Sequence, residues 1–172
     1  MRALILGGGE AGRFIAASLS HEAEVVLVDD DPQALAMAEE GLDVLTMRGD
    51  VTHRRVLERA EAHRADVAVA VTGHDAVNVA AAVMAREVGV GRTIARVDDP
   101  GFYRSNEGLE RDIAGIDACI CAARLVGREL LRMVTSIDAA FTSAPGGGAA
   151  HVALVRVDAG SPFRGENPSK MR

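Results

Sequence analysis

The sequence predicts an α/β fold with a doubly wound, six-stranded parallel sheet covered by helices on both faces. Three observations predict it. Short apolar runs alternate with helical patterns from the first residue. Hydrophobic residues make up 48% of the 172 residues, which is enough for a sizeable core. Aromatic residues make up only 3%, so the core must be aliphatic, as is typical of buried parallel strands.

Six runs with strand character alternate with six helical stretches. The first helical stretch places Gly12, Ile15, Ala16 and Leu19 on one face, as an amphipathic helix requires. The second begins at Pro32, a residue tolerated in the first helical turn, after Asp31 as N-cap. The expected strands are 3–6, 24–28, 44–47, 66–71, 93–97 and 118–121, and the expected helices are 11–20, 32–40, 53–62, 76–88, 102–111 and 124–134.

The helical stretch 124–134 carries apolar residues on more than one side, and so does 76–88. Such a helix is either wedged deep in its own domain or forms a subunit interface. The interface interpretation is favoured for 124–134 because it lies at the end of the sheet.

The pattern changes after residue 134. Residues 1–140 are expected to form one nucleotide-binding domain, and 141–150 a glycine-rich linker. Residues 151–157 alternate like a new strand, and the chain stops fifteen residues later. Because a lone strand cannot form a core, 151–172 is interpreted as the truncated start of a second lobe.

The strongest motif is the glycine-rich turn that follows the first strand and opens the first helix. It comprises Gly7, Gly8, Gly9, Glu10, Ala11 and Gly12. It fits G-x-G-x-x-G, the fingerprint of dinucleotide-binding Rossmann folds. Gly7 permits the tight turn, Gly9 lets a pyrophosphate approach the backbone, and Gly12 lets the helix pack against the strand. Phosphates would then meet free N–H groups at the positive end of the helix.

Asp29 ends the second strand, seventeen residues after Gly12. A carboxylate there accepts hydrogen bonds from ribose hydroxyls and repels a 2′-phosphate, which favours NAD or an adenosine nucleotide over NADP. Asp30 and Asp31 compete for this role, but Asp31 is better explained as a helix cap.

Other candidate residues follow the third, fourth and fifth strands. Asp50 is either an acceptor for an adenine amino group or a plain turn residue. Thr72 and Gly73 end the fourth strand beside the switch point where such sheets bind ligands, and Asp75 would cap the next helix. Arg96 either neutralises a phosphate or pairs internally with a neighbouring aspartate.

Several classes of protein are excluded or disfavoured. A net charge of −6 and a pI near 5.4 argue against nucleic-acid binding. Cys119 and Cys121 are not accompanied by a second pair of cysteines, as a zinc site would require. They are therefore interpreted as buried apolar residues, and no metal site is expected. No apolar run approaches the roughly 18 residues that a membrane helix needs, which predicts a cytoplasmic chain. No catalytic residues are identified, and the chain is expected not to be an enzyme.

The motifs around Gly7, Asp29, Asp50, Thr72 and Arg96, in this order, resemble the N-terminal domain of regulators of potassium conductance, the RCK or TrkA-N family. The likeness is greatest to NAD-binding subunits of Trk potassium-uptake systems. The resemblance implies that Val51 lines the nucleotide together with the residues of these motifs. It also implies that helix 124–134 forms the contact between the two subunits of a dimer.

The resemblance further implies a regulatory subunit at the inner face of the cell membrane, as a homodimer or larger ring. Its partner would be a potassium transporter or channel on a separate chain. NAD or NADH is the expected ligand, with ADP or ATP as the alternative. Glu10 replaces an arginine of Ktr-type relatives and would oppose a triphosphate. The rival interpretations are a truncated NAD-dependent oxidoreductase, and a module of a potassium channel or cation/proton antiporter.

Overall fold

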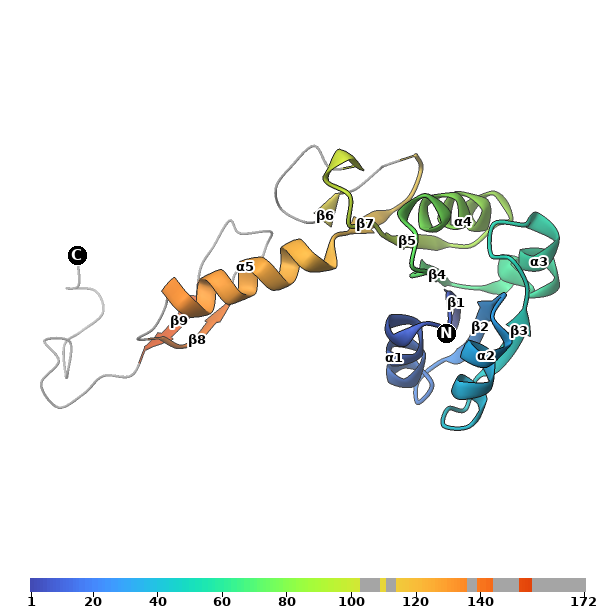
Figure 1. Cartoon of the computed structure of the whole chain (residues 1–172), viewed down its shortest axis with the longest axis horizontal. Coiled ribbons are helices and arrows are strands. Elements are labelled where there is room, and N and C mark those ends of the chain that lie inside the picture. The colour runs from blue at the N-terminus through green and yellow to red at the C-terminus, as the bar shows by residue number, and fades with distance from the viewer. Residues whose placement is uncertain (103–108, 111–113, 136–138, 144–151, 156–172) are drawn as a thin grey trace, which may run out of the picture. The chain divides into compact units, whose positions relative to one another are not determined.

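The computed structural model of the chain describes residues 1–102, 109–110, 114–135, 139–143 and 152–155 (Figure 1). They belong to two compact units, Met1–Leu125 and Val126–Arg172. The first unit contains six parallel strands in the order β3-β2-β1-β4-β5-β7. These strands are β1 (Arg2–Leu6), β2 (Glu24–Asp29), β3 (Leu45–Arg48), β4 (Val67–Ala70), β5 (Arg92–Arg96) and β7 (Ala118–Ile120). The predicted doubly wound sheet is confirmed.

The helices lie on both faces of this sheet because side chains alternate along each strand. Leu4 and Leu6 of β1 join the core under α3 (Arg54–Arg59) and α4 (Asp75–Glu87). Ala3 and Ile5 of the same strand join the opposite core, under α1 (Glu10–Leu19) and α2 (Pro32–Glu39). The carboxyl ends of β1, β2 and β4 therefore meet the amino ends of α1, α2 and α4 at one edge of the sheet.

Helix α4 packs on β4 and β5 with a face made of small residues. Its buried residues are Asn78, Ala81, Ala82 and Ala85, and the three alanines are at most 1% exposed. Because each alanine carries a single methyl group, the helix backbone lies close to the sheet.

One predicted helix is wrong in part. Residues 102–111 were expected to be helical, but a 3₁₀ turn, η2, covers Pro100–Phe102, and Leu109–Glu110 form β6. The two residues of β6 pair antiparallel with β7, Leu109 with Ile120 and Glu110 with Cys119. This pairing with a later strand overrides the local helical pattern. The rest of the predicted helix lies outside the described residues.

Helix α3 is shorter than expected. It ends at Arg59, where a helix to residue 62 was predicted. Glu61 takes a left-handed conformation with φ of 52°, and a 3₁₀ turn, η1, covers Ala62–Arg64. The start of α2 is as predicted, since Asp31 accepts a hydrogen bond from the Gln33 amide at 2.9 Å and Pro32 follows it.

Helix α5 (Ala122–Thr135) begins in the first unit and continues into the second. The second unit also holds a hairpin of β8 (Ala139–Ser143) and β9 (Val152–Val155). Residues 141–143, expected in the linker, thus belong to a strand. Within the described ranges, no helix has both the length and the apolar character needed to span a membrane.

The apolar side chains of α5 are largely exposed, which leaves the predicted interface role of this helix open as a prediction. The exposed residues are Leu125, Val126, Leu130, Leu131, Met133 and Val134.

Candidate functional site

Two positions of the glycine motif admit only glycine, Gly7 in the turn after β1 and Gly12 in the first turn of α1. Gly7 has φ of 118°, and a Cβ atom there would lie 2.8 Å from the amide nitrogen of Thr72. A Cβ atom on Gly12 would lie 1.8 Å from the Gly7 carbonyl oxygen. Gly9, by contrast, faces open space and is the N-cap of α1 without any side-chain cap. Because glycine has no side chain with which to cap the helix, the first amides of α1 could donate to a ligand, and their predicted role in phosphate binding remains a prediction.

Asp29 is bonded to this glycine turn. Its Oδ2 accepts a hydrogen bond from the Gly8 amide at 2.5 Å, and its Oδ1 accepts one from the Asp31 amide at 2.8 Å. Arg13 braces the turn from the helix side, donating from Nη1 to the Gly8 carbonyl oxygen at 2.8 Å. The carboxylate is thus fixed at the end of β2, and its remaining lone pairs can accept further hydrogen bonds.

A cavity of about 360 Å³ is lined by Asp29, and a second of about 510 Å³ is lined by Glu10, Ala11 and Arg96. The two cavities share Gly9, Val71 and Gly73 as lining residues. Each is of the size that small-molecule sites have, about 300–1,000 Å³. Because they meet at Gly9, a ligand with two halves joined by phosphates would reach both.

Nine of the twelve candidate residues line these cavities, and the other three form the turn itself. Asp29, Asp50, Val51 and Thr72 line the smaller cavity, Glu10, Ala11 and Arg96 the larger, and Gly9 and Gly73 both. Gly7, Gly8 and Gly12 shape the backbone.

Further residues line the cavities although none of them is among the predicted site residues; Asp30 and Asp31 were weighed only as alternatives to Asp29. These further residues are Phe14 in the larger cavity and Asp30, Asp31, Ala34, Gly49, His74 and Val77 in the smaller, with Val71 in both. For Phe14 a signal was available, because it follows Glu10 by four residues and so lies on the same helix face. Within the described part of the chain, no group of three or more His, Cys, Asp or Glu residues could hold a metal ion.

Asp50 is held in a turn although it lines the smaller cavity. Its Oδ1 accepts hydrogen bonds from the hydroxyl and the amide of Thr52, at 2.7 Å and 2.8 Å. Its Oδ2 lies 3.0 Å from Nδ1 of His53. The pKa of Asp50 lies below its ordinary value, mainly because the Thr52 hydroxyl and then its amide bond to the carboxylate. The turn role is thus observed, and the adenine role remains a prediction.

A buried amide ties the ends of β4 and β5 together. Asn78 is fully buried, and its Oδ1 accepts hydrogen bonds from the amide and the hydroxyl of Thr72, both at 2.7 Å. Its Nδ2 donates to the carbonyl oxygens of Thr72 at 3.1 Å and Arg96 at 2.9 Å. The side chain of Asn78 thereby holds together Thr72 and Arg96, two cavity-lining residues that are 24 positions apart in the sequence.

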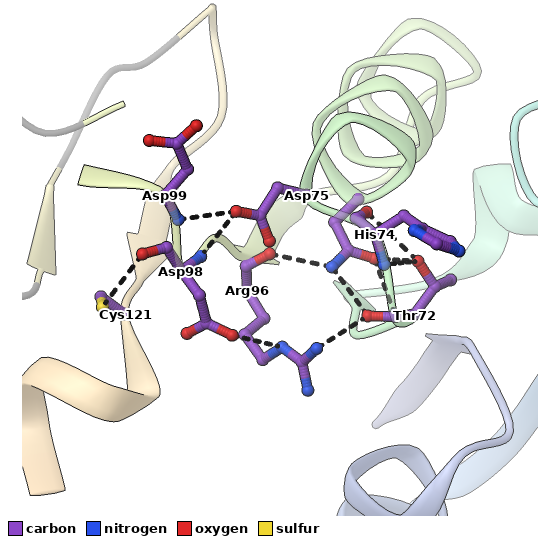
Figure 2. Close-up of polar contacts among 8 residues, drawn as sticks. Thr72, His74, Asp75, Arg96, Asp98, Asp99 and Cys121 are labelled. Carbon is purple, nitrogen blue, oxygen red and sulfur yellow. Dashed lines mark hydrogen bonds and ion pairs between the residues drawn. The ribbon is translucent and has the colours of Figure 1, made fainter. Parts of the chain in front are cut away.

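Arg96 is paired inside the protein while it lines the larger cavity (Figure 2). Its Nη2 donates to the Thr72 carbonyl oxygen at 3.0 Å. Its Nε lies 3.4 Å from Asp98 Oδ2, close enough for an ion pair, but this buried nitrogen lacks hydrogen-bond geometry. The two predicted roles of Arg96, contact with a phosphate and internal pairing with an aspartate, therefore do not exclude each other.

Asp75 does not cap α4, contrary to expectation. The N-cap is His74, which makes no side-chain cap bond. Oδ2 of Asp75 instead accepts hydrogen bonds from the amides of Asp98 at 2.9 Å and Asp99 at 2.7 Å (Figure 2). Cys121, the residue before α5, approaches the Asp98 carbonyl oxygen with its sulfur at 3.9 Å. The loop after β5 is thus held from both sides.

The strand order and the glycine turn define a Rossmann-type domain. Residues 3–122 match the model of the TrkA-N domain, and the chain belongs to this family. It is 34% identical over 134 residues to the Trk system potassium uptake protein TrkA homolog of Archaeoglobus fulgidus, a match that covers 78% of this chain and 30% of that protein. The chain spans about a third of the length of the first curated relatives that it matches.

Two solved structures of the GsuK channel are also similar. The one bound to ADP is 25% identical with a TM-score of 0.63, over 80% of this chain and 35% of the other. The one bound to NAD is 23% identical with a TM-score of 0.62, over 80% of this chain and 23% of the other.

Proposed function

We propose that this chain binds NAD or NADH across the two cavities and regulates a potassium-uptake system of the cell membrane. It would do so as a cytoplasmic subunit that associates with the inner face of the membrane through a separate transporter or channel chain. The observation that carries the proposal is the pair of cavities that meet at Gly9, beneath the uncapped start of α1.

The smaller cavity suits an adenosine. Asp29 would accept hydrogen bonds from the ribose hydroxyls, with its carboxylate held in place by the Gly8 and Asp31 amides. Asp50 and Val51 line the same cavity, where the adenine would lie. The diphosphate would bind the free amides at the start of α1, near Gly9. The ADP-bound relative at 25% identity supports an adenine nucleotide in such a site.

The larger cavity favours a dinucleotide over ADP or ATP. ADP would fill the adenosine side and leave about 510 Å³ unoccupied, whereas the second nucleoside of NAD would enter it. Glu10 lines this cavity and would repel the third phosphate of ATP. Arg96 provides the compensating positive charge for a diphosphate.

A regulatory role is favoured over a catalytic one by the curated relatives, whose names place them in Trk potassium-uptake systems. Two nucleotides, such as NAD⁺ and NADH, would stabilise different relative orientations of paired domains. Only a difference in affinity between the two orientations can shift their populations. The exposed apolar face of α5 would form the dimer, and residues 151–172 would begin the second lobe.

Calorimetric titration with NAD⁺, NADH, ADP and ATP tests the binding step. Asp29→Asn is the test variant, and Asp43→Asn, at an exposed position outside the cavities, is a control with the same change of charge. Loss of a charged hydrogen-bond acceptor costs about 1.5–3 kcal/mol. We expect roughly tenfold or greater weakening in Asp29→Asn and none in Asp43→Asn. Absence of binding by all four nucleotides would refute the nucleotide site.

Small-angle scattering of the chain with saturating NAD⁺ and with NADH tests the regulatory step. Different scattering curves are the expected result, since the proposed gating requires two domain arrangements. If both nucleotides bind and the curves are identical, the population-shift mechanism loses its basis.

A further inference from the structure

Phe14 is the most exposed large hydrophobic side chain in the described part of the chain, at 73%. It lies in the second turn of α1, whose buried residues are Gly12 and Ala16. It belongs to neither of the two core clusters. Folding therefore does not explain an aromatic residue at this position, and its exposure calls for a partner outside the folded unit.

The larger cavity is the place where Phe14 can find that partner, because Phe14 lines this cavity together with Glu10 and Arg96. A helical side chain leans toward the N-terminus of its helix and covers the turn that precedes it. The ring of Phe14 therefore leans toward Glu10 and Gly9, where a diphosphate would bind. The Cα atom of Phe14 lies only about 6 Å along the helix from that of Glu10.

A second nucleoside that continues from the diphosphate into the larger cavity would pass over this ring. Planar, electron-poor rings stack favourably on aromatic side chains. We propose that Phe14 stacks on the nicotinamide ring of NAD⁺ and makes the site select this dinucleotide over ADP and ATP. The inference rests on the proposed nucleotide site and assigns its specificity to one residue of this chain.

Calorimetry on Phe14→Ala tests the selectivity. Met37→Ala is the matched control, because Met37 is a 58% exposed apolar residue of α2 that lines neither cavity. Loss of one stacked ring weakens binding by roughly tenfold. We expect NAD⁺ affinity to fall by about this factor in Phe14→Ala, ADP affinity to stay the same, and both to stay the same in Met37→Ala.

Tryptophan fluorescence tests the contact itself, because the natural chain has no tryptophan. Phe14→Trp introduces one indole at the cavity, and Met37→Trp introduces one outside it. Stacking on oxidised nicotinamide quenches indole emission by contact. NAD⁺ should therefore quench Phe14→Trp strongly, ADP should not, and neither should quench Met37→Trp.

The outcomes separate the two proposals. If neither NAD⁺ nor ADP binds the unchanged chain, both the nucleotide site and the stacking are wrong. If both bind and Phe14→Ala leaves their affinity ratio unchanged, only the stacking is wrong. A lower oligomeric mass of Phe14→Ala in sedimentation, with an unchanged affinity ratio, would assign Phe14 to contact with a second copy of the chain and overturn the inference.

Discussion

Replacement of Asn78 by alanine should destabilise the domain far more than a typical surface substitution. The variant loses an acceptor for the Thr72 amide and a donor to the Arg96 carbonyl oxygen, which Asn78 bonds at 2.7 Å and 2.9 Å. Each buried polar group left without a partner costs about 1–3 kcal/mol. The higher helix propensity of alanine returns about 0.5 kcal/mol. The two groups together cost about 2–6 kcal/mol, so the expected net loss is about 1.5–5.5 kcal/mol, against a total of about 5–15 kcal/mol for a typical domain.

Urea unfolding followed by far-ultraviolet circular dichroism measures this loss, since the chain has no tryptophan to report it. With a slope of about 2 kcal/mol/M, the midpoint should fall by roughly 1–3 M, and the slope itself should be unchanged. Ala80→Asn is the control, because Ala80 is exposed on the same helix and the change costs only helix propensity. If Asn78→Ala lowers the unfolding free energy by less than about 0.5 kcal/mol, the buried amide does not hold the two strand ends.

Two further perturbations follow from local geometry. Gly12→Ala should cost roughly 2 kcal/mol or more and abolish nucleotide binding, because its methyl group would lie 1.8 Å from the Gly7 carbonyl oxygen. Gly41→Ala, at a position with open space, is the control in urea unfolding and calorimetry, and equal stability of the two variants would contradict the packing argument. The pKa of Asp117 lies below its ordinary 3.8, mainly because the buried amide of Thr93 donates to the carboxylate. Its contribution to stability is therefore present above about pH 4 and lost as the pH falls through the lowered pKa. Asp117→Asn should lower the unfolding free energy at pH 7, and its deficit should shrink below pH 4 in urea titrations; a deficit that stays constant to pH 3 would refute this assignment.

The sequence predicts the sheet well because burial on both faces leaves a local record. The central strands β1, β2 and β4 are short aliphatic runs, and alternation with helices determines the layers. The glycine turn can also be predicted from the sequence, because contacts within the turn or with the adjacent strand require glycine at Gly7 and Gly12. The candidate residues predicted from the motif therefore gather at one edge of the sheet.

Features that depend on residues far apart in the sequence are harder to predict. Asp75 looks like a helix cap from its neighbours, but its carboxylate bonds to amides 23 and 24 residues away. The strand pairing of Leu109–Glu110 depends on β7 and overrides a local helical pattern. The role of Asn78 likewise depends on Arg96, 18 residues further on. None of these contacts has a spacing that a single sequence would reveal.

The alanine face of α4 has a mechanical consequence. Long side chains at a helix–sheet contact can change rotamers and let the helix slide, but the methyl groups of Ala81, Ala82 and Ala85 have no rotamers to change. Helix α4 and the strands β4 and β5 should therefore move as one rigid body. Asn78 and Asp75 belong to this helix. A displacement that begins at the cavities would therefore be transmitted to the loop after β5, because the side chains between helix and sheet cannot repack to absorb it.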